Sequence, residues 1–124
     1  EFRSLGISLS RVSTVYCLEC ATCSKQYIGE TGQPVRVRLN VHHADTKYNL
    51  PKTVAVHFNQ QDHTFNQAKL YILQTNFRSA RERKYIEAYS IHKFNSLQPS
   101  GINVARRNLE SLKAIARLRQ HLQT

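Results

Sequence analysis

Three cysteines lie within seven residues of this chain, at Cys17, Cys20 and Cys23. Thiols spaced this closely rarely form a structural disulfide, and an odd number cannot pair completely. Clustered thiols are more often metal ligands in a reducing compartment, and the C-x-x-C spacing is typical of zinc sites. Cys20 and Cys23 therefore predict half of a tetrahedral zinc site.

The other half of such a site has to come from two histidines. The candidates among the six histidines of the chain are His42, His43, His57 and His63. His57 and His63 are six residues apart, near the spacing of paired histidines in zinc sites. The alternative is that the thiols are free and buried and that the histidines lie at the surface.

The charge of the chain indicates a polyanionic partner. The 124 residues include 18 Lys and Arg against 8 Asp and Glu, a formal net charge of +10. Nucleic acid is the simplest partner for so basic a domain, and an anionic membrane surface is the competing one. No apolar run approaches the roughly 18 residues of a membrane span. Of the two partners we expect nucleic acid, and no membrane. The sequence lacks Met and begins at Glu1, so we expect a piece of a longer polypeptide.

Basic side chains gather in two stretches, around residues 78–84 and 106–119. The first stretch begins a predicted helix, where cations oppose the helix dipole, which suggests a binding role. Contacts to several phosphates would make binding strongly salt-dependent. The predicted DNA contacts are Gly29, Arg36, Arg78, Arg81, Lys84, Arg106, Lys113 and Arg117.

The elements that position these residues follow from hydrophobic periodicity and turn signals. The pattern predicts an α+β domain, and length fits one domain with a core of its own. The predicted strands are 12–19, 26–30 and 68–75, the first two joined as a hairpin through 20–25, and the predicted helices are 53–59, 79–95 and 105–122.

Residues 35–42 are ambiguous, because apolar and polar side chains alternate there without a break. Alternation is the strand period and slightly favours a strand. As a helix, the same segment would place Arg38 and His42 one turn apart, with Pro34 where a helix can begin. The residue pattern alone leaves both interpretations open.

Two tyrosines, Tyr16 and Tyr27, face each other across the predicted hairpin, which by itself is ordinary cross-strand packing. With residues further along, however, they resemble the GIY-YIG nucleases. The second family motif is intact as Tyr27-Ile28-Gly29, while the first is reduced to Thr14-Val15-Tyr16. The ordered set that matches the family is Tyr16, Tyr27, Arg38, His42, Glu87 and Asn103.

Two further features point to one branch of this family. One is the cysteine pair between the two predicted strands, and the other is His57 within Val54-Ala-Val-His-Phe-Asn59. Together they look like the endonuclease domain of Penelope-like retroelements, over about residues 13–103. Cys17 is an addition to that pattern, and Thr14 replaces a glycine. The resemblance implies a helix at 34–47, and so decides the ambiguous segment.

The resemblance also implies a role for each matched residue. Glu87 would hold one catalytic Mg²⁺ or Mn²⁺, although without the family a surface pair with Arg83 would be the simpler interpretation. Arg38 would hold the phosphate, and Asn103 would orient the substrate or brace the site. Either tyrosine would position or deprotonate the attacking water, with His42 as a further acid–base group. Tyrosine is a poor base unless the metal and Arg38 lower its pKa, which is ordinarily about 10.

With His42 assigned to the active site, His57 and His63 remain as the zinc pair. Cys17 would then point away from the zinc or replace one histidine. A structural Zn²⁺ held in this way would tie the hairpin loop to residues 53–63.

The expected organisation is an N-terminal extension at 1–11, an endonuclease domain at 12–104 and a basic amphipathic helix at 105–124. The domain would have a three-stranded antiparallel sheet flanked by helices, with a zinc-binding insert. By resemblance it would nick chromosomal DNA in the nucleus and leave a 3′ hydroxyl, which primes reverse transcription by a companion reverse-transcriptase domain of the same polyprotein.

Two alternatives stay open. The first is a catalytically inactive, zinc-stapled nucleic-acid-binding module. The second is a GIY-YIG nuclease of repair or intron homing, which the cysteine pair within the hairpin disfavours.

Overall fold

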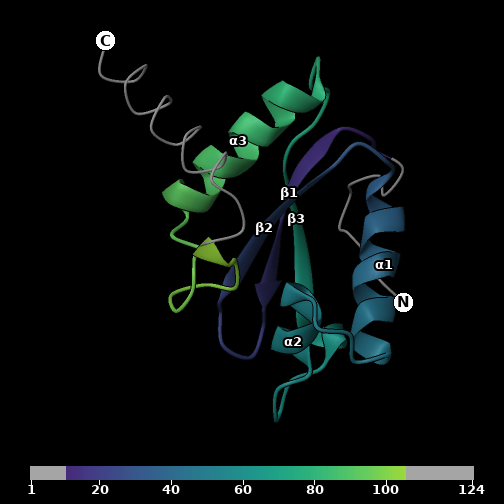
Figure 1. The fold of residues 1–124 in the computed structure, drawn as a ribbon, viewed down its shortest axis with the longest axis vertical. Coiled ribbons are helices and arrows are strands. Elements are labelled where there is room, and N and C mark those ends of the chain that lie inside the picture. Colours follow the sequence, from purple (N-terminus) through teal and green to yellow (C-terminus); the bar gives the residue numbers. More distant parts are fainter. Residues whose placement is uncertain (1–10, 106–124) are drawn as a thin grey trace.

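The computed structural model describes residues 11–105, so all but Arg11 of the expected extension and all but Ala105 of the expected C-terminal helix lie outside it. The described chain is an α+β fold, as expected from the sequence (Figure 1). Its elements are β1 (Thr14–Cys20), β2 (Gln26–Thr31), α1 (Val35–Lys47), α2 (Thr53–Phe58), the 3₁₀ turn η1 (Phe65–Gln67), β3 (Ala68–Gln74) and α3 (Ala80–Lys93).

The three strands form one antiparallel sheet in the order β2-β1-β3. In the central strand, Tyr16 lies opposite Gly29 of β2 and Ile72 of β3. Helices α1 and α2 lie on one side of the sheet and α3 lies on the other (Figure 1). Both faces of β1 are therefore covered, which explains why six of its seven residues are buried.

The alternation of side chains along β1 divides the core into two parts. Tyr16, Leu18 and Cys20 join the cluster that includes Val35 and Leu39 of α1. Val15 and Cys17 point the other way, into a cluster with Ile91 of α3 and other apolar residues. Each face of the central strand thus meets its own helical layer.

The ambiguous segment is the helix α1, from Val35 to Lys47, in agreement with the family resemblance. Its buried residues Val35, Leu39, His42 and Thr46 recur at helical spacing. Val41, which a strand would have buried with Val35 and Leu39, is 39% exposed. The alternating pattern was therefore misleading, because a stripe at helical spacing runs through it.

The segment 96–103 covers the free edge of β2. The backbone N–H of Ile102 donates to the carbonyl of Gln26, at 2.9 Å. Edge strands left open invite pairing with other chains, and this segment closes the edge. Within residues 11–105, no helix has the length and apolar character needed to cross a membrane.

Candidate active site and metal centre

Three aromatic rings meet on the face of the sheet that α1 covers. The Tyr16 hydroxyl oxygen lies 2.8 Å from Nε2 of His42, and both side chains are buried. The Tyr27 ring stands 6.5 Å from that of Tyr16 and 5.6 Å from that of His42, centre to centre. Two strands and one helix thus bring together three residues that are spread over 27 positions of the sequence.

Gly29 makes room for this arrangement. A Cβ atom at this position would lie 2.5 Å from both Cζ and the hydroxyl oxygen of Tyr16. The ring of Tyr16 therefore lies directly against the backbone of β2, which only glycine permits. Gly29 is buried there, so its lack of a side chain has a packing explanation, and the DNA contact expected for it stays a prediction.

Burial raises the pKa of Tyr16 well above its usual value of about 10, and the neighbouring Tyr27 raises this pKa further. The guanidinium of Arg38 lowers the pKa, through its charge and a hydrogen bond, and the carboxylate of Glu87 raises it. Arg38 and Glu87 are thus close enough to act on the Tyr16 hydroxyl. In the protein without metal this hydroxyl is protonated at neutral pH, so it is better suited to positioning than to removing a proton.

Glu87 reaches the site from the opposite helical layer. It lies half-buried on α3, the helix that packs on β2. One turn earlier, Nε of Arg83 donates to Glu30 of β2 at 2.5 Å and a terminal nitrogen donates to Ser13 at 3.2 Å. Arg83, considered above as a surface partner of Glu87, therefore anchors α3 to the strand that carries Gly29.

Asn103 braces the site. Its side-chain oxygen accepts from the backbone N–H of Ile28 at 2.9 Å, and its nitrogen donates to the carbonyl of Ile28 at 3.0 Å. Ser96 donates to the same oxygen of Asn103, at 2.6 Å. The amide thus replaces a neighbouring strand at the middle residue of Tyr27-Ile28-Gly29. Of the two roles expected for Asn103, its burial and these bonds fit the bracing role.

A pocket of about 410 Å³ opens beside the rings, between α1 and the start of α2. Tyr27, Arg38 and His42 line one part of it, and Asp45 and Lys52 line another. The last two were not singled out in the sequence. The signal that was available is the spacing 38, 42, 45, which places all three side chains on one helical face.

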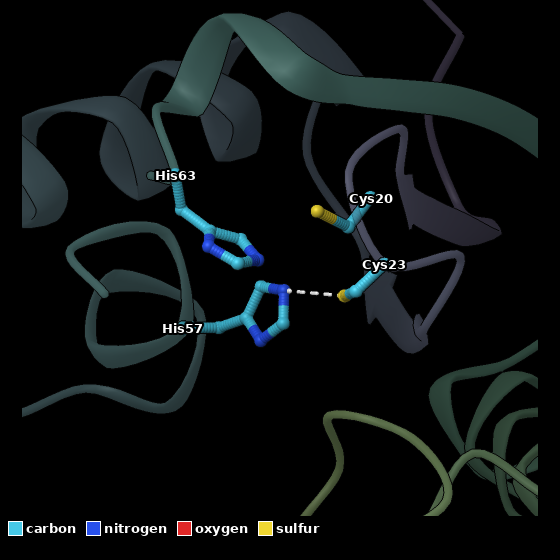
Figure 2. A group of neighbouring side chains, drawn as sticks. All are labelled: Cys20, Cys23, His57 and His63. Atoms are coloured by element: carbon cyan, nitrogen blue, oxygen red, sulfur yellow. Dashed lines mark hydrogen bonds between the residues drawn. The ribbon is translucent and has the colours of Figure 1, made fainter. Parts of the chain in front are cut away.

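The expected zinc ligands converge at the other end of β1 (Figure 2). One ligand atom from each of Cys20, Cys23, His57 and His63 lies within 4.8 Å of all the others. The Sγ of Cys23 stands 3.5 Å from Nε2 of His57, and the imidazoles of His57 and His63 are 5.0 Å apart, centre to centre. The end of β1 and the hairpin turn supply the thiols, and α2 and the loop after it supply the imidazoles.

Two observations show that this cluster fits a metal ion. Nε2 of His63 is buried and has no hydrogen-bond partner among residues 11–105, as expected for an atom that would ligate a metal. Burial lowers the pKa of His57 to about 4, so its imidazole is neutral at neutral pH, the form that binds metal. Thiolates and imidazoles are the ligands that Zn²⁺ prefers.

The remaining candidate ligands lie elsewhere. Cys17 belongs to the core cluster on the opposite face of the sheet, so it points away from the metal cluster. The ring of His43 stacks on Phe65, with centres 5.1 Å apart. The structure thus selects His57 and His63 from the four histidines considered.

The structure describes some of the residues predicted to contact DNA. Arg36 on α1, Arg78, and Arg81 and Lys84 on α3 are all exposed, as a DNA-binding role requires. Arg106, Lys113 and Arg117 lie outside the described residues. A contact between any of these side chains and DNA stays a prediction.

No known family model matches this chain, and no curated protein sequence matches it significantly. A solved structure does match it: the catalytic domain of the homing endonuclease I-TevI, with a TM-score of 0.63. The chain has the GIY-YIG fold. The match covers 75% of this chain and 98% of the other at 20% sequence identity, so it confirms the fold expected from the tyrosine motifs.

Proposed function

We propose that this chain is a metal-dependent DNA endonuclease domain of the GIY-YIG type. The observation that carries the proposal is the convergence of Tyr16, Tyr27, Arg38 and His42 beside one pocket, with the charge of Glu87 acting on the same hydroxyl. The likeness to a homing-endonuclease catalytic domain supports it. So does the net charge of +10, which suits a DNA substrate.

Each residue would contribute a separate part of phosphodiester hydrolysis. Glu87, a half-buried carboxylate, suits one hard divalent cation such as Mg²⁺ or Mn²⁺. The bound cation would supply charge neutralisation and a more acidic water. Arg38 would hold the scissile phosphate through its planar, permanently charged guanidinium.

The tyrosines and the histidine would position the attacking water. The buried hydroxyl oxygen of Tyr16 lies 2.8 Å from Nε2 of His42. This contact fixes the orientation of the hydroxyl, so it would bind the water from one direction. His42 would accept a proton that passes through this hydroxyl, which explains why a tyrosine of raised pKa suits the site. Tyr27 would hold the water from the pocket side.

The finer proposal concerns the biological setting. We infer that the chain belongs to a retroelement polyprotein of the Penelope-like kind, acts in the nucleus, and nicks its target to leave a 3′ hydroxyl for a reverse-transcriptase domain of the same polyprotein. The support is the cysteine pair between β1 and β2, brought together with His57 and His63. In this proposal the four side chains hold a structural Zn²⁺.

The test is to incubate supercoiled plasmid with the chain and Mg²⁺ or Mn²⁺, beside an EDTA control. We expect metal-dependent nicks that a DNA polymerase extends without prior phosphatase treatment, because the nick leaves a 3′ hydroxyl. Nicks that the polymerase cannot extend would contradict the priming role. No nicking by the wild type, together with tight, salt-sensitive binding, would favour the zinc-stapled binding module.

The homing-endonuclease neighbour favours one other candidate, a GIY-YIG nuclease of homing or repair. The same experiment separates the two, because a nuclease that breaks both strands linearises the plasmid, whereas a priming enzyme only nicks one strand. Linear product formed as early as nicked circles would favour the homing or repair enzyme.

A further inference from the structure

The pocket beside the active-site rings continues past the residues that the proposed chemistry uses. Along α1 its wall is made by Arg38, Val41, His42 and Asp45, which share one helical face. The facing wall is the segment 51–54, at the start of α2. At about 410 Å³ the pocket falls within the roughly 300–1,000 Å³ range of small-molecule sites.

Two charged side chains in this extension have no role in the proposed hydrolysis. Asp45 is half-buried and Lys52 is exposed, and both line the pocket. Among residues 11–105, neither forms an ion pair with another side chain. A carboxylate and an ammonium group are thus both available to a molecule in the pocket.

We propose that this extension binds the base of the nucleotide next to the cleaved phosphate, and that the preferred base is guanine. The inference rests on the proposed nuclease function, because Arg38 places the phosphate and the pocket extends from Arg38 along α1. With the phosphate held by Arg38, a nucleotide adjoining it would enter the part of the pocket that Asp45 and Lys52 line.

Hydrogen-bond chemistry selects guanine. Its pairing edge carries two adjacent N–H donors beside a carbonyl oxygen, and it is the only DNA base with two neighbouring donors on that edge. The two oxygens of Asp45 accept from both donors, and Lys52 donates to the carbonyl oxygen. Tyr27 and the apolar Val41 and Val54 offer contacts to the faces of the base. The pairing edge is accessible only when the base is unpaired, so the nucleotide leaves the duplex to enter.

Sequencing the nick positions of wild-type protein on plasmid DNA tests the proposal. We expect guanine to be enriched about tenfold at a nucleotide adjoining the cut. Asp45→Asn replaces one acceptor by a donor and should abolish this enrichment. The control is Asp62→Asn, the same change at an exposed residue outside the pocket lining, where φ is 67° and asparagine fits equally well. It should keep the enrichment.

Two outcomes on active enzyme would overturn the base-binding pocket while leaving the nuclease function intact. One is a wild type with no guanine enrichment beside its cuts, and the other is an enrichment that survives in Asp45→Asn.

If the wild type does not nick, the nuclease function fails and the pocket is tested separately. The chain is then titrated with dGMP and dAMP and followed by the amide NMR signals of residues 38–45 and 52–54. Selective shifts with dGMP that are lost in Asp45→Asn support the pocket. Equal responses to both nucleotides, or none, overturn it.

Discussion

Tyr16 is the residue on which the candidate active site depends. Its ring rests on Gly29, its hydroxyl contacts His42, and the charges of Arg38 and Glu87 act on it from two helices. Because burial keeps this hydroxyl protonated, the role we propose for the tyrosine is to hold the water and relay a proton rather than to act as a free base.

Replacing Tyr16 by Phe keeps the ring and removes the hydroxyl. We expect single-turnover nicking to fall by about 10²–10⁴-fold, the usual contribution of a positioned proton-transfer group. The free energy of unfolding should fall by about 1–3 kcal/mol, because Nε2 of His42 loses a buried partner. Tyr71→Phe is the control, since Tyr71 is 45% exposed. Equal nicking rates for the two variants would show that the hydroxyl has no part in the reaction.

Gly29→Ala tests the close contact between β2 and the Tyr16 ring. The added methyl group would lie 2.5 Å from the ring, so the ring has to move, and we expect a loss of about 1–3 kcal/mol of stability in denaturant unfolding. Gly32→Ala is the matched control, because the atom nearest to its Cβ, in the guanidinium of Arg83, would be 3.3 Å away, a much smaller overlap than at Gly29. If both variants were equally stable, the ring would not be fixed by this contact.

Much of the site was predictable at the residue level, because chemistry limits the choice. The C-x-x-C pair and the His57–His63 spacing predict a metal cluster whose ligand atoms the fold does bring together. Lys52 was not predictable in this way, since its place beside Asp45 depends on how the segment 51–54 packs against α1. Local sequence carries no record of that packing.

Among the elements, α3 has the task of bringing a carboxylate to a site built on the other face of the sheet. The ion pair between Arg83 and Glu30 is mostly buried, with the side chains 13% and 21% exposed. It joins α3 to β2 one turn before Glu87 and thereby sets the position of the proposed metal ligand.

Arg83→Gln should therefore weaken both stability and metal use. We expect a loss of about 1.5–3 kcal/mol in the free energy of unfolding, the usual range for a hydrogen bond to a charged group. We also expect a higher Mg²⁺ concentration at half-maximal nicking. Arg11→Gln, the same change at an exposed position that is not a predicted DNA contact, controls for lost positive charge. If the Mg²⁺ requirement of Arg83→Gln equalled that of Arg11→Gln, the ion pair would not position Glu87.

The helix α1 is the element for which the alternation of side chains favoured the wrong secondary structure. Alternation over residues 35–42 favoured a strand, yet the buried positions 35, 39, 42 and 46 follow the helical period. A stretch whose apolar residues fit both periods is decided by what packs against it. Here the sheet face around Tyr16 and Leu18 provides that partner.

At the scale of the whole molecule, the metal cluster adds a link between β1 and α2, which already share a core through Cys20, Val54 and Phe58. It links the end of β1 and the following turn to α2 and the loop after α2. The start of α2 also forms one wall of the pocket. A small domain gains stability from such a link, because the metal holds distant segments together only in the folded state.

Metal analysis tests this link. We expect one Zn²⁺ per chain and a fall in melting temperature of at least about 5 °C after chelation, equivalent to roughly 1 kcal/mol in a domain of this size. The His63→Gln variant should lose the metal. The His92→Gln variant, which changes an exposed position on α3, should keep it. A metal content unaffected by His63→Gln would remove the site.

The most direct test of the central claim is single-turnover nicking of supercoiled plasmid by Glu87→Gln at saturating Mg²⁺. The matched control is Glu82→Gln, the same change at an exposed position on the same helix. We expect Glu87→Gln to nick roughly a hundredfold more slowly or worse, because the cation loses its carboxylate. Glu82→Gln should match the wild type. Wild-type rates in Glu87→Gln would contradict the assignment of this site as the centre of a metal-dependent nuclease.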